Sequence, residues 1–243
     1  MNRTAARSGH FGAWQLCAAG LLCCAAAHGA DEATIPDLTG VWMIDNAPTA
    51  LHPTPGSAVP LTGWGHTQFE HNQAMRVKGD LSFDLAATQC ASPGAVRMMT
   101  LPYRMEIFQR PYQVTLLFEW NHLYRLINTR GYAMQAPYPM AIGISNGHWE
   151  DKTLVVKTTS LTGNTQLDSS GLPHSDDLEV TERFRLDGPS WLTDVVTVHD
   201  PKAFSRDWSV TLRYHKVAAS GLSEDICLDR IDVGQPAFPR ALD

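Results

Sequence analysis

Apolar and polar residues alternate with a period of two along much of the chain beyond residue 100. In 113–120 the apolar residues Val114, Leu116 and Phe118 lie two positions apart, and 208–217 shows the same spacing. Because successive side chains of a strand point to opposite faces, this pattern predicts strands with one buried face. Including less regular segments, we expect strands at 103–109, 113–120, 123–129, 153–160, 178–186, 191–199 and 208–217.

Turn-forming residues separate these segments at short intervals, as at Arg130-Gly131 and at 187–190. Many short strands with hairpin turns between them indicate an antiparallel sheet, which either closes into a barrel or packs as a sandwich. The sequence shows no internal repeat and no low-complexity tract in this region. We therefore predict a single domain over 31–243.

The part of the chain before residue 80 has a different pattern. A first strand is expected at 37–44, and it contains the motif Gly40-x-Trp42. The segment 47–60 holds four prolines, which predicts an extended surface connection because proline removes backbone donors. Thr62 is a suitable N-cap for a helix over 63–77.

A Gly-x-Trp motif in an opening strand, followed by antiparallel strands, resembles the lipocalin and wider calycin barrels. We therefore expect a mainly all-β fold, an antiparallel lipocalin-like β-barrel with one short N-terminal helix, and keep an open β-sandwich as the alternative. In lipocalins a late-strand arginine packs over the tryptophan of this motif. Here Arg213 falls on the polar face of its strand.

The first thirty residues have the composition of an export signal. Arg3 and Arg7 precede an apolar stretch at 13–27, and small residues at 28–30 come before Asp31. The stretch is shorter than the roughly 20 residues of a spanning helix. We predict a signal peptide at 1–30, cleaved near Ala30, and a periplasmic or secreted protein; a retained anchor and a lipidated cysteine are the alternatives.

Charge and cysteine content narrow the range of partners. Without residues 1–30, 17 Lys and Arg face 25 Asp and Glu, a net charge of −8. This dispersed negative charge argues against nucleic acid and against an anionic membrane as partners. The two cysteines that remain, Cys90 and Cys227, are expected to form a disulfide in an oxidising compartment, with two free thiols as the alternative.

Three ionisable residues fall on strand faces that are otherwise apolar. Glu182 is in phase with Val180 and Phe184, Arg125 is in phase with its apolar neighbours, and so is Asp194. A buried charge needs a partner or a functional role. We expect a polar cluster inside the barrel, which is either structural or binds a ligand.

Histidines supply further candidates for acid–base chemistry. His148 and Glu150 alternate onto one face of a short strand end, and His174 precedes the strand that carries Glu182. The segment 143–147 fits the pattern G-x-S-x-G, but we interpret it as a Gly-rich turn because no helix follows it. Neither a metal-ligand set nor a phosphate-binding loop stands out, so we expect no metal and no cofactor.

The chain also resembles an uncharacterised family of exported proteins from Gram-negative bacteria. The resemblance spans about residues 37 to 230 and rests on several motifs, among them 38–42, 143–156, 174–184 and Asp200-Pro201. It implies no activity. It does place four polar residues in recurring motifs: Glu106, His174, Glu182 and Arg183.

Two functions follow from these observations. The first is a barrel that binds a small apolar or aromatic molecule in its interior, with Arg125, Glu150, Arg183 and Asp194 as candidate ligand-binding residues. The second is a cofactor-independent lyase, isomerase or hydrolase. Its candidate catalytic residues are Glu182, His174, Glu106 and His148. The sequence does not distinguish between the two, and it does not predict the oligomeric state.

Overall fold

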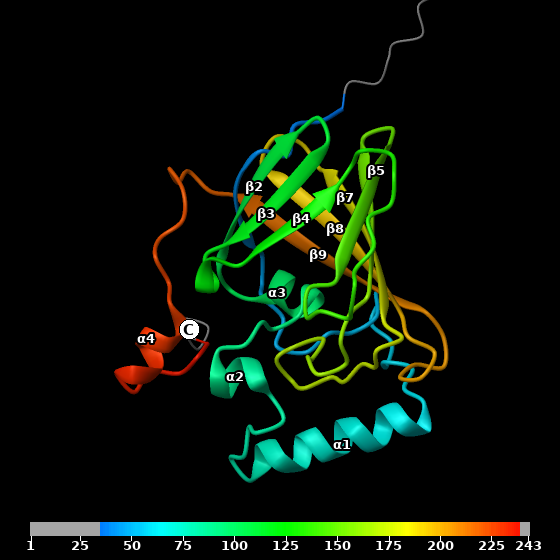
Figure 1. Cartoon of the computed structure of the whole chain (residues 1–243), viewed down its shortest axis with the longest axis vertical. Helices are drawn as coiled ribbons and strands as arrows, with labels where there is room; N and C mark the ends of the chain where they lie inside the picture. Colours follow the sequence, from blue (N-terminus) through cyan, green and yellow to red (C-terminus); the bar gives the residue numbers. More distant parts are fainter. Residues whose placement is uncertain (1–34, 239–243) are drawn as a thin grey trace, which may run out of the picture. The chain divides into compact units, whose positions relative to one another are not determined.

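In the computed structural model, which describes residues 35–238, the chain forms a closed β-barrel (Figure 1). Its strands are β1 (Gly40–Ile44), β2 (Arg104–Arg110), β3 (Gln113–Phe118), β4 (Tyr124–Asn128), β5 (Ile144–Glu150), β6 (Thr153–Thr159), β7 (Glu179–Leu186), β8 (Trp191–His199) and β9 (Trp208–Lys216). The predicted all-β barrel is confirmed. The open sandwich is excluded, because β9 pairs with β1 and closes the sheet. The expected signal peptide at 1–30 lies outside the described residues.

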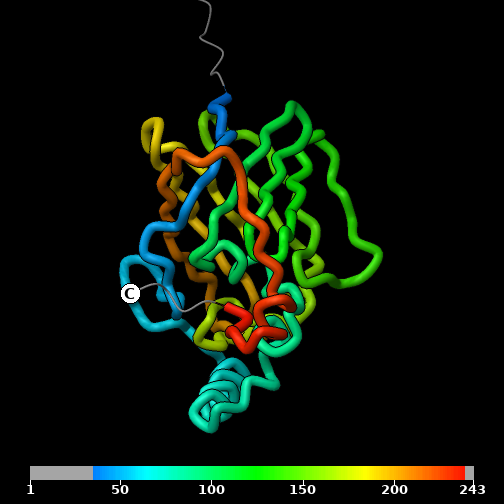
Figure 2. The backbone as a smooth tube through the Cα atoms, turned by 90° about the vertical axis from the view of Figure 1, so that its left-hand side faces the viewer, coloured from blue at the N-terminus to red at the C-terminus, as the bar shows by residue number. Residues whose placement is uncertain are grey.

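The strands follow one another around the barrel in sequence order. Among the described strands, β4 and β5 form the one parallel pair, with Ile127 opposite Ser145 and Asn128 opposite Asn146. Parallel neighbours need a connection that returns along the strands, and 129–143 provides it. Figure 2 shows this light-green connection bulging outward beside the strands. The antiparallel prediction is therefore wrong for this pair.

The structure also corrects the predicted Gly-rich turn at 143–147. Residues 144–147 belong to β5, which continues to Glu150. The alternation of apolar and polar side chains is hard to recognise in β5, because Gly147 has no side chain. Glycine is needed there because the position lies close to the neighbouring strand. A Cβ at Gly147 would lie 2.8 Å from Ile127 Cγ2, so a larger residue would push β4 and β5 apart.

Inward-facing side chains from every strand fill the barrel. Buried and less buried positions alternate clearly along β3, β7 and β9, as the period-two pattern predicts. The inward-facing apolar side chains form one continuous core with residues from the adjoining segments. Among its most buried members are Trp42, Ile107, Leu116, Ile127, Leu154, Phe184 and Leu192.

The predicted helix is present as α1 (Gly63–Val77), capped by Thr62, whose Oγ1 accepts from Gly65 N. Further short helices were not predicted: α2 (Leu85–Gln89), α3 (Ala95–Thr100), η1 (Trp120–His122) and α4 (Cys227–Asp232). Every residue of α3 is buried. Because the Tyr214 hydroxyl of β9 donates to Met99 O at 2.9 Å, α3 is held directly against the barrel interior.

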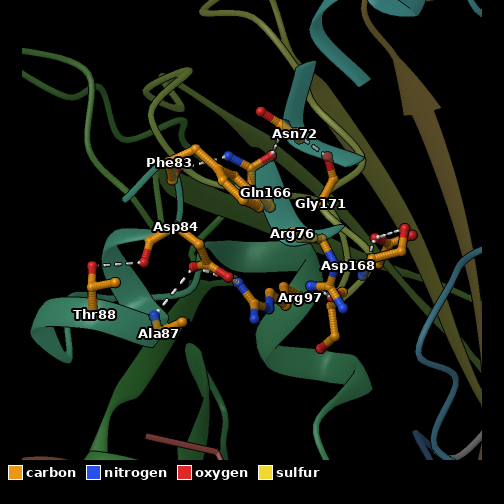
Figure 3. A network of polar contacts seen from close by, with 12 residues as sticks. Asn72, Arg76, Phe83, Asp84, Ala87, Thr88, Arg97, Gln166, Asp168 and Gly171 are labelled. Carbon is orange, nitrogen blue, oxygen red and sulfur yellow. Dashed lines mark hydrogen bonds and ion pairs between the residues drawn. The ribbon is translucent and has the colours of Figure 1, made fainter. Parts of the chain in front are cut away.

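Hydrogen bonds attach α1 to the segment 166–171. Asn72 Nδ2 donates to Gly171 O at 2.9 Å (Figure 3), and Arg76 Nη1 donates to Ser169 O at 2.7 Å. The carboxylate of Asp168 orders this segment by accepting from three backbone amides, one of them Leu51 N. Polar contacts therefore position α1, which has few buried residues of its own.

The predicted disulfide between Cys90 and Cys227 is present, with a Cα–Cα distance of 5.7 Å. It joins the end of α2 to the start of α4. The residues after α4 are held nearby, because Trp120 Nε1 donates to Ala237 O and the Trp120 ring stacks on Phe238. The C-terminal segment is thereby fixed beside α2 and η1.

Within residues 35–238, no helix has both the length and the apolar character needed to cross a membrane.

Candidate functional site

A charged pair lies inside the barrel at the centre of a polar cluster. Arg125 on β4 donates from Nη1 to Glu182 Oε1 on β7 at 2.8 Å, and its Nη2 contacts the second carboxylate oxygen. Arg125 Nε donates to Ser145 Oγ at 2.8 Å, and Nη2 also donates to Thr158 Oγ1 at 2.7 Å. Both charged residues are 1% exposed. The sequence places both residues in phase with apolar neighbours, and the structure shows that they contact each other inside the barrel.

Burial alone would favour a neutral form of each charged group. For Arg125 it acts to lower the pKa, but the carboxylate of Glu182 outweighs it, so the pKa stands above the ordinary value. The guanidinium therefore stays charged. With two contacts to one carboxylate and one to each hydroxyl, Arg125 has a fixed orientation.

Asp194 on β8 is the unusual member of the cluster. It is fully buried, and no group in residues 35–238 donates a hydrogen bond of ordinary geometry to either of its carboxyl oxygens. Burial, reinforced by the charge of Glu182, raises its pKa well above the usual 3.8. Burial and the same acids also raise the pKa of Tyr214. The interior thus holds one ion pair and a second carboxyl group that favours its protonated form.

A cleft leads from the surface toward this cluster, between β4 and β5. The two strands pair through only two residue positions, so most of β4 has no strand neighbour on this side. The cleft has a volume of about 500 Å³, and Arg125 and Ser145 are among its lining residues. The remaining lining is mainly apolar: Leu123, Tyr124, Leu126, Met134, Met140, Ile142 and Ile144.

Gly143 fixes the backbone at the cleft wall. Its φ of +64° lies in the left-handed region, and a Cβ there would come within 2.4 Å of Thr159 O. A side chain is excluded by both conformation and space. Glycine at this position lets the returning connection enter β5 close to β6.

Three of the predicted site residues lie together on the outer surface of the barrel. His148 Nε2 is 3.0 Å from Glu150 Oε1, and Arg183 Nη2 donates to Glu150 Oε2 at 2.8 Å. The hydrogen bond from Arg183, and then that from His148, lowers the pKa of Glu150. All three side chains are exposed, and they point away from the interior cluster.

His174 belongs to a separate, buried network in the segment before β7. One ring nitrogen lies 2.8 Å from Thr165 Oγ1 and the other 2.9 Å from Ser175 O, so both are in use. Ser175 in turn donates to Asp200 through its N and Oγ. Burial lowers the pKa of His174, which favours the neutral ring. These contacts connect His174 to the loops and not to Glu182.

Glu106 lies on β2 between Met105 and Ile107, whose side chains are buried. Its own side chain is on the opposite, outer face of the strand. The structure thus brings Arg125, Glu182 and Asp194 together and places the other predicted site residues elsewhere.

Sequence reasoning missed several members of the interior cluster. Ser145 was assigned to a turn, and Thr158 and Tyr214 carried no charge to attract attention. Thr158 is in phase with the buried Leu154 and Val156 of β6. A polar residue on an otherwise apolar strand face could therefore have indicated that Thr158 belongs to the interior cluster. A second buried pair joins Asp84, the N-cap of α2, to Arg97 of α3, and a strand alternation pattern could not reveal it.

The residues from 35 to 238 contain no group of three or more His, Cys, Asp or Glu side chains arranged to hold a metal ion. Comparison with protein-family models, with curated proteins and with solved structures returned no match for this chain.

Proposed function

We propose that this protein binds a small, largely apolar or aromatic molecule in the cleft between β4 and β5. The observation that carries the proposal is the position of the cleft: it opens in the barrel wall where strand pairing is interrupted and reaches Arg125 and Ser145 of the buried polar cluster. Concave apolar sites with a few convergent polar groups are the usual form of small-molecule sites.

The size and lining of the cleft set the class of ligand. A volume of about 500 Å³ lies in the range of small-molecule pockets. Tyr124, Leu126 and Met134 are among the more exposed apolar residues of the chain, and all three line the cleft. Burying them beneath a ligand would remove apolar surface from water, which favours binding.

Arg125 and Ser145 would give the ligand its orientation. Because Glu182 already neutralises Arg125, a fully charged anion would have to compete with the existing pair. The site therefore favours a neutral polar group, such as a hydroxyl or carbonyl, near Ser145 Oγ.

Acid–base catalysis is the second candidate function. It is favoured by Asp194, a buried carboxyl group with a raised pKa, close enough to Glu182 for its charge to act. Neither His174 nor His148 lies with this pair, so a proton relay through histidine has no support. Turnover would require substrate to reach Asp194 through the cleft.

Export to the periplasm or medium is part of the proposal. The disulfide Cys90–Cys227 supports an oxidising compartment, and the composition of residues 1–30 supports a cleaved signal. N-terminal sequencing of the protein from the periplasmic fraction tests both points: a first residue between His28 and Glu32 is expected, and a chain still beginning at Met1 would contradict them.

Native mass spectrometry of the purified protein, followed by binding of Nile red, tests the proposed cleft. We expect either a co-purified small molecule or Nile red fluorescence that saturates with one site. Ile142→Trp should fill the cleft and weaken binding by about tenfold or more, a loss of roughly 1.4 kcal/mol. Leu228→Trp, which adds the same side chain at an exposed position of α4, is the matched control.

If both variants bind Nile red as tightly as the unchanged protein does, the cleft is not the binding site. Loss of binding in both would show that an added tryptophan disturbs the protein in general.

A further inference from the structure

A second pocket lies beside α3, apart from the cleft. Its volume is about 450 Å³. It is lined by residues from α1, α2 and α3, from the loop at 47–49 and from the C-terminal segment at 236–238, and shares none of its lining residues with the cleft. The proposed function makes no use of it.

Arg97 of α3 is the buried charge in this pocket, with 2% of its surface exposed. Its Nη1 donates to both oxygens of Asp84, each at 2.8 Å. Asp84 also caps α2 by accepting from Ala87 N at 3.2 Å (Figure 3). The Asp84 carboxylate therefore caps α2 and accepts from only one nitrogen of the guanidinium, Nη1.

Within residues 35–238, no acceptor lies at the opposite edge of the guanidinium. Arg97 Nε is buried without a hydrogen-bond partner, and Nη2 donates to no group in residues 35–238. The Phe238 ring lies against the flat face, 4.6 Å from Arg97 Cζ. Buried donors nearly always have a partner, so an unused edge beside a pocket calls for an acceptor.

The pocket also carries excess positive charge. Arg76 lines it from α1, and its Nη1 donates to a backbone carbonyl, Ser169 O, which leaves its charge uncompensated. Two arginines against the single carboxylate of Asp84 give a net charge of +1 among the charged residues that line the pocket. An anion with one negative charge would balance it.

We propose that this pocket binds a small organic carboxylate. The two carboxylate oxygens accept from Nε and Nη2 of Arg97, the bidentate geometry for which the planar guanidinium is suited. Arg76 adds long-range attraction. The apolar part of the ligand lies against Leu81, Leu101 and Phe238, which line the same pocket.

Calorimetric titration with benzoate and its neutral isostere benzamide tests the proposal. We expect benzoate to bind and benzamide to bind at least about tenfold more weakly, because only the carboxylate supplies two charged acceptors. Arg97→Lys keeps the charge beside Asp84 but removes the two-donor edge, and should weaken benzoate binding by about tenfold or more. Arg185→Gln is the matched control, because Arg185 is exposed and pairs with Asp187 at the surface; this variant should bind benzoate as the unchanged protein does.

Two further measurements cover the case in which Arg97→Lys does not fold. Arg76→Gln should weaken benzoate binding and make it less sensitive to salt. In the unchanged protein, the NMR signal of the Arg97 Nε–H group should shift on addition of benzoate and not of benzamide. Equal binding of the two probes, tighter binding of inorganic phosphate than of benzoate, or an Arg97 signal unmoved by benzoate would overturn the proposal.

Discussion

Lys216 lies over the indole ring of Trp42, with Nζ 5.3 Å from the ring centroid, and donates to Thr39 O at 2.9 Å. Trp42 is on β1 and Lys216 ends β9, so the contact lies at the seam that closes the barrel. Arg213, which the sequence places on the polar face of its strand, lies over Trp191 on the outer surface and not over Trp42. Its Cζ is 4.5 Å from the centroid of the Trp191 ring.

Gly40→Ala should destabilise the barrel at this seam. A Cβ at Gly40 would lie 2.4 Å from Lys216 Cε, and its φ of +143° disfavours any side chain. We expect a loss of about 1–3 kcal/mol in the free energy of unfolding, measured by urea denaturation. In the double variant with Lys216→Ala the loss should be smaller than the sum of the single losses, because the clash is gone. Simple additivity would show that Lys216 moves aside without cost.

Glu182→Gln should lower the free energy of unfolding by about 3–5 kcal/mol, because it removes the carboxylate that contacts the buried Arg125 guanidinium. Replacing both residues, with Arg125→Met and Glu182→Leu, should recover most of this loss. Glu179→Gln is the matched control, since Glu179 pairs with Lys157 on the surface. Guanidinium denaturation gives all three values. A loss for Glu182→Gln no larger than for Glu179→Gln would mean that water reaches Arg125.

Asp194→Asn should become more stabilising, relative to the unchanged protein, as the pH rises from about 4 to 8. The pKa of Asp194 is raised in the folded state, so above its ordinary value of 3.8 the unfolded chain releases a proton that the folded chain retains. The contribution of Asp194 to stability is therefore complete below that value and is lost as the pH rises toward the folded pKa. Melting temperatures of both proteins across this range measure the effect. A constant difference would contradict a shifted pKa.

His174→Gln should alter the pH dependence in the opposite sense. The pKa of His174 is lowered by burial, so below the ordinary 6.5 the unfolded chain binds a proton that the folded chain does not. The unchanged protein should lose stability as the pH falls from about 7.5 to 5.5, and His174→Gln should lose less. His66→Gln, at an exposed position of α1, serves as control. Parallel curves for all three proteins would show that His174 takes up a proton without unfolding.

Reduction of Cys90–Cys227 should lower the melting temperature clearly. The bridge spans 137 positions, and the loop-entropy model assigns such a cross-link about 4–5 kcal/mol. The double variant Cys90→Ser/Cys227→Ser should match the reduced protein and be insensitive to reductant. An unchanged melting temperature would indicate that the contacts of Trp120 with Ala237 and Phe238 hold the C-terminal segment without the disulfide.

The sequence by itself determined those features that depend on local pattern. Strands with one apolar face, such as 113–118 and 208–216, follow from alternation, because side chains of a strand point to opposite faces. The helix 63–77 was predicted from Thr62 as its N-cap. The interior positions of Arg125, Glu182 and Asp194 followed from strand phase in the same way.

Tertiary structure decided which of these residues meet, because contacts between distant strands depend on register and closure. Arg125 and Glu182 are 57 positions apart, and only the barrel brings them together. The parallel pairing of β4 and β5, which opens the cleft, depends on the path of residues 129–143, for which the sequence has no periodic signal. The edge of Arg97 left without an acceptor likewise exists only once α3, α2 and Phe238 have packed around it.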